Sequence, residues 1–299
     1  MNKGTDHSHE RNELEIDSTL KHEWPDAETV LLAIKSAPPA NRSSFGSASL
    51  DTGVNGKSDK LPNPGFVWLG GFKSDMIGTK AETMVEQAEK LNCGSLRFDY
   101  SGHGLSTGKF IEGAISRWVD ESLAVFRAKT KGRQILVGSS MGGWIALRLA
   151  EELIKLGEVN RLAGLLLIAP AADFTAELME PQFTEQQRQA LETQGYFEEP
   201  SAYSDEPNVI TKALIEDGRQ NLVLNNDLSL GVPVRILQGM KDPDVPYHHA
   251  LRLVESLPHD DVSISLIKDG DHRLSRDEDL ELLKRTMKNL LDEINFSKA

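Results

Sequence analysis

The chain has 299 residues, of which 39% are hydrophobic and 26% are charged. This length suits one large α/β domain or two small ones with a substantial core. The formal net charge of −13 argues against nucleic acid or an anionic membrane as the main partner. A single cysteine, Cys93, excludes an internal disulfide and favours a reducing, cytoplasmic location.

The N-terminal region predicts neither a membrane span nor a targeting segment. No run of 18 apolar residues occurs, so we expect no transmembrane segment. The first residues lack the apolar core of a secretory signal and are too acidic for a mitochondrial transit peptide. Residues 1 to about 25 are polar and aperiodic, which predicts a disordered arm, followed by a folded domain over residues 26–299.

Short apolar runs alternate with amphipathic stretches along most of the chain. We expect strands at 29–34, 66–69, 95–98, 134–137, 162–169, 233–237 and 262–267, and helices at 79–91, 115–129, 141–156, 247–256 and 277–295. The stretch 38–64, rich in Ser, Gly, Asn and Pro, fits either a long loop or a weak hairpin. The alternation predicts an α/β fold, with a mostly parallel sheet and helices on both faces.

The alternation stops between about residues 171 and 231. The sequence there indicates two or three helices, at 177–195 and 209–221, joined by polar turns. Such a length is unusual for a structureless loop in a compact domain. We therefore predict a helical cap over the edge of the sheet where the parallel strands end, which is where functional residues gather in such folds.

The pattern Gly138-x-Ser140-x-Gly142 lies between an expected strand and an expected helix. A sharp strand-to-helix turn would expose the central side chain, and its strained backbone needs small neighbours two residues away. This is the pattern of a nucleophile elbow, and it favours Ser140 over the adjacent Ser139 as a nucleophile. The alternative interpretation is an ordinary Gly/Ser turn.

A serine nucleophile needs a base and a group that orients the base. Asp242 follows the expected strand 233–237, and His272 follows the strand 262–267 after a Gly and an Asp. The chain order Ser140, Asp242, His272 is the order of an α/β-hydrolase triad. Asp244 and Asp271 remain alternatives to Asp242, which comes soonest after its strand.

The backbone N–H groups of Phe72 and Met141 are the expected oxyanion hole. Met141 begins the helix after the serine, and Phe72 lies in the Gly70-Gly71-Phe72 loop after an early strand. The other histidines are expected to be structural or exposed, including His103 in a glycine turn and His248 and His249 at a helix start.

Three rival chemistries are not supported by the sequence. Val54-Asn55-Gly56-Lys57-Ser58 ends like a phosphate loop, but Asp51 replaces the glycine that should precede it. Gly102-His103-Gly104 begins like a dinucleotide fingerprint, but Thr107 stands where the third glycine should be. Neither an H-E-x-x-H pattern nor a pair of cysteines occurs in the sequence, so we expect no cofactor and no metal.

Over roughly residues 62–295 the chain resembles the α/β-hydrolase superfamily. More narrowly, it is similar to the mitochondrial depalmitoylating α/β-hydrolases and their bacterial relatives. The blocks that carry the likeness are Gly78-Thr79-Lys80-Ala81, Arg97-Phe98-Asp99-Tyr100-Ser101-Gly102, Ile135-Leu136-Val137-Gly138-Ser139-Ser140-Met141-Gly142-Gly143-Trp144, Gly239-Met240-Lys241-Asp242 and Asp271-His272-Arg273. The acidic N-terminal arm favours a bacterial-type cytoplasmic member.

The resemblance implies that Ser140, Asp242 and His272 form the triad and that the substrate is an S-palmitoyl protein thioester or an acyl glucuronide. We therefore expect a serine esterase or thioesterase that acts on a small-molecule or lipid acyl substrate, or on an acylated protein. The apolar cap side chains could line an acyl pocket or simply pack the cap: Phe174, Leu178, Met179, Phe183, Leu191, Tyr196, Phe197, Leu214 and Ile215. A non-catalytic binding module and a hydrolase-fold acyltransferase or carbon–carbon hydrolase are the alternatives.

Overall fold

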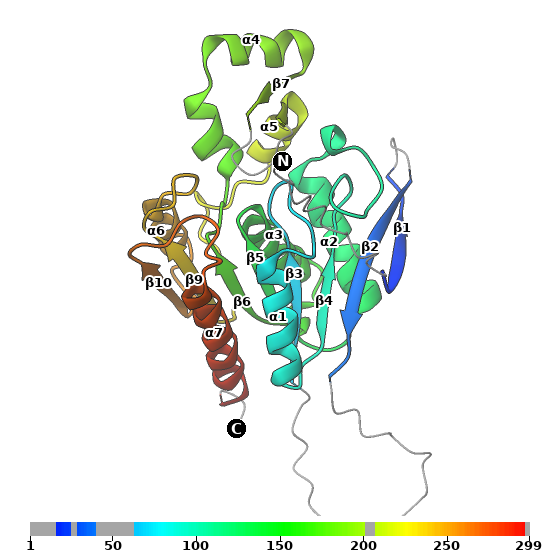
Figure 1. The fold of residues 1–299 in the computed structure, drawn as a ribbon, viewed down its shortest axis with the longest axis vertical. Coiled ribbons are helices and arrows are strands. Elements are labelled where there is room, and N and C mark those ends of the chain that lie inside the picture. The colour runs from blue at the N-terminus through cyan, green and yellow to red at the C-terminus, as the bar shows by residue number, and fades with distance from the viewer. Residues whose placement is uncertain (1–15, 25–28, 40–62, 201–206, 297–299) are drawn as a thin grey trace, which may run out of the picture.

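The computed structural model describes residues 16–24, 29–39, 63–200 and 207–296. These residues form an eight-stranded sheet with the strand order β1-β2-β4-β3-β5-β6-β9-β10 (Figure 1). Its strands are β1 (Ser18–His22), β2 (Val30–Ala37), β3 (Gly65–Leu69), β4 (Ser95–Phe98), β5 (Gln134–Ser139), β6 (Leu162–Ile168), β9 (Val234–Gly239) and β10 (Val262–Ile267). Strand β2 runs antiparallel to both neighbours, and the remaining pairs are parallel.

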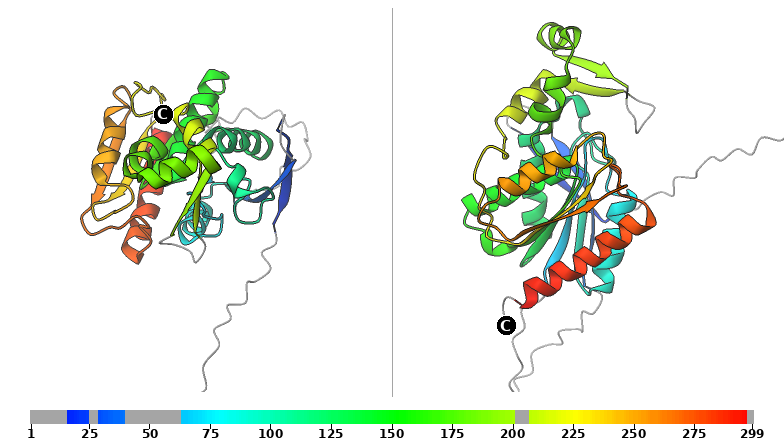
Figure 2. Two further views of the ribbon diagram at one scale, coloured as in Figure 1. Left: turned by 90° about the horizontal axis from the view of Figure 1, so that it is seen from above. Right: turned by 90° about the vertical axis from the view of Figure 1, so that its left-hand side faces the viewer.

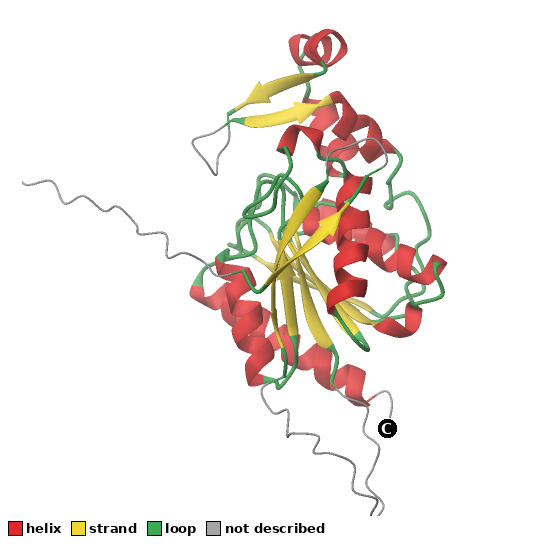
Figure 3. Ribbon diagram, turned by 90° about the vertical axis from the view of Figure 1, so that its right-hand side faces the viewer, coloured by secondary structure: helices red, strands yellow, loops and turns green. Residues whose placement is uncertain are grey.

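Helices cover both faces of the sheet (Figure 3). One face carries α1 (Thr79–Lys90) and α7 (Asp277–Phe296), and the other carries α2 (Ile115–Lys129), α3 (Met141–Lys155) and α6 (Tyr247–Glu255). Each face has its own buried apolar cluster, so the central strands are apolar on both sides. Strand β6, whose seven residues are all buried, shows this most clearly. The expected α/β fold is confirmed.

The N-terminal edge of the sheet differs from the expectation. Strand β1 pairs antiparallel with β2, so residues 18–22 belong to the sheet and the prediction of an arm to about residue 25 was wrong there. Half-buried and exposed positions alternate in β1, as at a sheet edge, but Leu20 is its one apolar residue, so its sequence carries little strand signal. The rest of the expected arm, residues 1–15, and most of the stretch 38–64 lie outside the described residues.

The segment 171–231 lies between β6 and β9 and stands beyond one end of the sheet (Figures 1 and 2). It contains η3 (Thr175–Met179), η4 (Glu180–Gln182), α4 (Glu185–Gln194), β7 (Tyr196–Glu199), β8 (Asn208–Thr211) and α5 (Lys212–Arg219). The sequence predicted helices here but missed the antiparallel pair β7–β8, whose strands have four residues each.

The outer part of this segment has a small apolar cluster of its own. Leu191 on α4, Phe197 on β7, Ile210 on β8 and Ile215 on α5 are buried together. Helix α4 begins with a capping box in which Thr184 and Gln187 satisfy each other's backbone N–H groups. The two remaining short helices are η1 (Phe110–Glu112) and η2 (Val159–Arg161). Among the described helices, none combines the length and apolar character needed to cross a membrane.

Candidate active site

Ser140 sits at the junction of β5 and α3, where the backbone turns sharply. Its φ of 54° and ψ of −121° lie in a region of backbone conformation that residues other than glycine rarely adopt. A Cβ on Gly138 would lie 2.3 Å from the Gly142 carbonyl oxygen, and a Cβ on Gly142 would lie 2.0 Å from that of Leu69. Both glycines are therefore required by close backbone contacts, as the elbow pattern predicted. Ser139, the alternative serine, is the buried last residue of β5.

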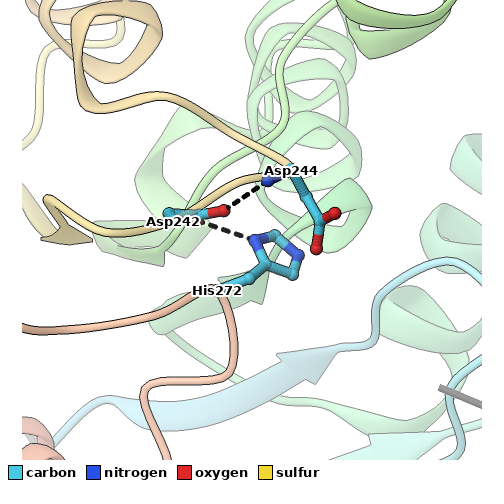
Figure 4. Close-up of side chains that lie close together, drawn as sticks. All are labelled: Asp242, Asp244 and His272. Carbon is cyan, nitrogen blue, oxygen red and sulfur yellow. Dashed lines mark hydrogen bonds and ion pairs between the residues drawn. The ribbon is translucent and has the colours of Figure 1, made fainter. Parts of the chain in front are cut away.

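His272 joins the serine to a carboxylate. Its Nε2 lies 3.0 Å from the Ser140 hydroxyl, and its Nδ1 lies 2.8 Å from Asp242 Oδ2. Figure 4 shows the imidazole beside the two acidic residues of the β9–α6 loop. Since an ionised carboxylate can only accept, Nδ1 carries the proton and Nε2 is free to accept the serine proton. Three residues from separate loops thus form one hydrogen-bonded line.

Hydrogen bonds from groups other than the histidine also hold the Asp242 carboxylate in place. Its Oδ1 accepts hydrogen bonds from the backbone N–H groups of Asp244 (2.9 Å) and Val245 (2.8 Å). Its Oδ2 accepts a third bond from the Gln238 side chain at 3.2 Å. The carboxyl group is buried, whereas Asp244 is exposed. Asp242, and not Asp244, is therefore the acid that bonds to His272.

Gln238 is a supporting residue that the sequence reasoning missed. It is fully buried near the end of β9, and its amide donates to the Val245 carbonyl at 2.9 Å as well as to Asp242. It thus ties the loop after β9 back to the strand. The only signal in the sequence was a polar residue in an otherwise apolar strand end.

The other acidic and basic candidates have different partners. Asp271 accepts from the backbone N–H of Leu274 at 3.0 Å and so shapes the histidine loop. His249 is buried, and its Nε2 donates to the Ala172 carbonyl at 2.6 Å. His103 donates from Nδ1 to the Ser101 carbonyl at 3.1 Å and accepts at Nε2 from the Lys73 N–H at 3.3 Å. None of the three lies in the hydrogen-bonded line.

Burial keeps the His103 ring neutral. The residue is 3% exposed and packs against the rings of Tyr100, Phe110 and Trp118. Desolvation lowers the pKa of His103 to about 4, so the ring is neutral at physiological pH. It supports the loop that follows Phe72, because Lys73 is its partner.

Ligand atoms of Asp242, Asp244 and His272 lie within 4.8 Å of one another, a spacing that could also suit a metal ion. Both ring nitrogens of His272 already face protein partners, Asp242 on one side and Ser140 on the other. A metal at the imidazole would displace one of them. The three residues therefore fit the hydrogen-bonded arrangement better than a metal site.

The expected oxyanion donors lie beside the serine. Met141 is the first residue of α3, where a backbone N–H has no partner within the helix. The loop that leads to Phe72 touches the serine, because a Cβ on Gly71 would lie 3.3 Å from the Ser140 Cβ. Within the described residues, no hydrogen bond to a protein atom uses either N–H. The arrangement suits an oxyanion held above Ser140.

The Phe72 side chain connects the site to the segment 171–231. Its ring makes edge-on contacts with Phe110 (4.8 Å between centroids) and Phe174 (5.8 Å). Phe72 and Met179 pack against both the core cluster of the α2–α3 face and the small cluster of the segment 171–231. Apolar side chains therefore link the loop beside Ser140 to this segment.

The chain is similar to known proteins. Residues 65–284 match the family described as "Alpha/beta hydrolase family". The human mitochondrial palmitoyl-protein thioesterase ABHD10 is 32% identical over 240 residues, covering 80% of this chain and 76% of that protein.

Two solved structures are also similar. A putative hydrolase from Agrobacterium vitis S4 is 46% identical with a TM-score of 0.80, covering 93% of this chain and all of the other. Mouse alpha/beta hydrolase domain-containing protein 10 is 29% identical with a TM-score of 0.74, covering 93% and 99%.

The chain therefore belongs to the alpha/beta hydrolase family, within the group that contains the ABHD10 thioesterases. The resemblance seen in the sequence motifs is confirmed. The protein is accordingly an enzyme of the class that hydrolyses esters and thioesters.

Proposed function

We propose that this protein is a serine hydrolase that cleaves carboxylic esters or thioesters through Ser140, His272 and Asp242. The observation that carries the proposal is the line of hydrogen bonds from Ser140 to His272 (3.0 Å) and from His272 to Asp242 (2.8 Å). A neutral imidazole oriented by a buried carboxylate is the base that a serine hydroxyl needs.

The reaction proceeds through an acyl-enzyme. The Ser140 oxygen attacks the acyl carbon while its proton moves to His272 Nε2, and the negative charge on the acyl oxygen is stabilised by the N–H groups of Phe72 and Met141. Collapse of this intermediate breaks the bond to the alcohol or thiol, which leaves with the proton from His272. A water molecule, deprotonated by the same imidazole, then releases the acid and restores Ser140.

The acyl group is proposed to be of medium or long chain. Half-buried apolar side chains of Phe72 and Met179 stand between the core and the segment 171–231, which we propose to act as the cap. Relatives at 32–33% identity carry the name palmitoyl-protein thioesterase. An S-palmitoyl protein is therefore one candidate substrate, and an acyl glucuronide, implied by the sequence resemblance, is the other.

A reducing compartment suits this chain, and we propose the cytoplasm. The one cysteine, Cys93, is buried, and burial raises the pKa of its thiol to about 11. The thiol is therefore kept out of disulfide chemistry. Fractionation of the native host, with antibodies against the protein, tests this location.

Labelling with a fluorophosphonate probe tests the nucleophile directly. Wild type is compared with Ser140→Ala and with Ser139→Ala as the matched control. The proposal predicts that Ser140→Ala abolishes labelling and Ser139→Ala retains it. A folded wild type that does not label would favour a binding module instead, and loss in Ser139→Ala alone would move the nucleophile by one residue.

The acyl group is tested separately with substrates of increasing chain length. Thioesters and oxyesters of the same acid are hydrolysed by the wild-type enzyme at matched concentrations. The proposal predicts that kcat/KM rises with chain length beyond acetyl. A preference for acetyl esters would remove the acyl-pocket part of the proposal while leaving the triad untouched.

A further inference from the structure

Lys80 is a half-buried cation that the proposed chemistry does not use. It is the second residue of α1, at the end of the helix where the dipole disfavours positive charge. Its ammonium nevertheless donates a hydrogen bond to the backbone carbonyl of Arg273, 193 residues further along the chain. Arg273 is the neighbour of His272, so this contact ties α1 to the loop that carries the imidazole.

The surroundings of Lys80 are apolar around its stem and acidic around its head. The side chain shares a crevice with Ile168 of β6, Leu237 of β9, Ile267 of β10, Leu274 of the histidine loop, and Asp279, Leu282 and Leu283 of α7. The charged groups that face the ammonium are Asp271 and Arg273 of the histidine loop, Asp242 of the β9 loop and Asp279 of α7. Desolvation nevertheless lowers the pKa of Lys80 to about 8.

Other hydrogen bonds hold the histidine loop on either side of Arg273. Gly270 accepts from the Lys241 N–H at 2.9 Å, and Asp271 accepts from the Leu274 N–H within the loop itself. Leu274 has a φ of 44°, so the chain bends sharply just after the imidazole. The Lys80 contact falls between these two points, on the residue next to the base.

We propose that Lys80 is a positioning residue of the hydrolase site, which fixes the His272 loop by holding the Arg273 carbonyl with a charged donor. The inference rests on the proposed function, because it concerns the alignment of His272 with Ser140. A small displacement of a catalytic base lowers the rate of the chemical step strongly. Lys80 touches neither the substrate nor the reacting atoms, so its effect is on kcat and not on substrate binding.

The ammonium and the neutral amine are not equivalent in this role. A charged donor forms a stronger hydrogen bond than a neutral one, and it is attracted by Asp271, Asp242 and Asp279. The contact therefore weakens when Lys80 loses its proton. We expect the activity of the wild type to fall as the pH rises through about 8.

The test compares wild type with Lys80→Met and Lys80→Arg, with Lys90→Met as the matched control. Lys90 is the exposed last residue of the same helix. The measurements are kcat and KM for a thioester substrate from pH 6 to 10, normalised to active sites by fluorophosphonate titration. Thermal denaturation of each variant reports on folding.

We expect Lys80→Met to lower kcat per active site by about tenfold with KM nearly unchanged. Lys80→Arg keeps its charge at every pH tested, so it should keep most of the activity and lose the alkaline decline. Lys90→Met should match the wild type. A loss of stability without a change in kcat or in the pH profile would mean that Lys80 is only structural, and would overturn the inference.

The two proposals fail in different ways. An inactive wild type that does not label with fluorophosphonate overturns the proposed function and this inference together. An active wild type whose kcat and alkaline decline survive in Lys80→Met overturns the inference alone. If Lys80→Met does not fold, the pH profile of Lys80→Arg decides, because an unchanged alkaline decline in that variant also overturns the inference.

Discussion

The environment of Asp242 separates it from the acidic residues near it. Its carboxylate is buried and accepts three hydrogen bonds before it meets His272, so its orientation does not depend on the histidine. Asp244 contributes its backbone N–H to Asp242, while its own side chain is exposed. A buried, fully bonded carboxylate holds one imidazole tautomer, which an exposed and screened one does not do.

Asp242→Asn should lower kcat by about four orders of magnitude, as expected when the group that orients the base can stabilise the wrong tautomer. The variant is nearly isosteric, so the fold should be retained. The measurement is steady-state hydrolysis of a thioester by active-site-titrated enzyme. Asp244→Asn is the matched control and should leave kcat almost unchanged, because its backbone donor remains. An equal loss in Asp244→Asn would make the neighbouring carboxylate the orienting group.

The segment 171–231 behaves as an element with its own small core. Phe197 of β7 lies edge-on to Phe183, with 5.1 Å between ring centroids, and is 6% exposed. The same cluster contains Ile210 and Ile215 and touches Phe72 beside the serine. Because Phe72 and Met179 pack against both this cluster and the core, the packing of the segment affects the apolar side of the site.

Phe197→Ala should destabilise this element locally by about 3 kcal/mol, since it removes a buried ring from a cluster with few members to fill the gap. Amide hydrogen exchange should accelerate across β7, β8 and α5 while protection of β5 and β6 is unchanged. Phe296→Ala removes a ring that is 82% exposed and should alter neither region. If protection of β5 fell together with that of β7, the segment and the sheet would form one cooperative unit.

The stability of the whole molecule depends on buried groups with shifted pKa values of opposite sign. Burial lowers the pKa of His103 to about 4, and it raises the pKa of Asp99 and of Asp173 to about 6. A buried neutral histidine stabilises the fold fully above its unfolded pKa of about 6.5. That contribution is lost as the pH falls towards 4, because the unfolded chain takes up a proton that the native chain does not.

The two buried aspartates act in the reverse direction. Their contribution is greatest below the unfolded pKa near 3.8 and is lost as the pH rises through about 6, because the unfolded chain ionises first. Asp99 accepts from the Met76 N–H, and Asp173 from the Val223 N–H, so each also holds a loop. Stability is therefore lost at His103 as the pH falls, and at Asp99 and Asp173 as it rises.

Wild type should lose up to about 3 kcal/mol of unfolding free energy relative to His103→Gln between pH 7 and pH 4. The variant removes the titrating ring and keeps a side chain that can donate and accept hydrogen bonds. Urea denaturation across this pH range measures the difference between the two curves. His248→Gln, at an exposed histidine, serves as the control and should parallel the wild type. Parallel curves for wild type and His103→Gln would contradict a strongly lowered pKa.

The amino-acid sequence by itself determined the features that depend on local sterics and apolar pattern. Apolar runs with strand length predicted the buried parallel strands, and the α/β fold is confirmed. The glycines at 138 and 142 marked the elbow at Ser140, because no larger residue fits against the facing backbone. The motif blocks identified the family, since their order along the chain is specific.

Only the tertiary structure decided which distant groups meet. The sequence favoured Asp242 but left Asp244 as an alternative, and burial and loop geometry bring the Asp242 carboxylate to His272. Strand β1 is recognisable once β2 is beside it, because an edge strand is stabilised by its pairing. The contact of Lys80 with the histidine loop joins residues 193 apart in sequence. Such contacts depend on how the elements pack, and no local pattern encodes that packing.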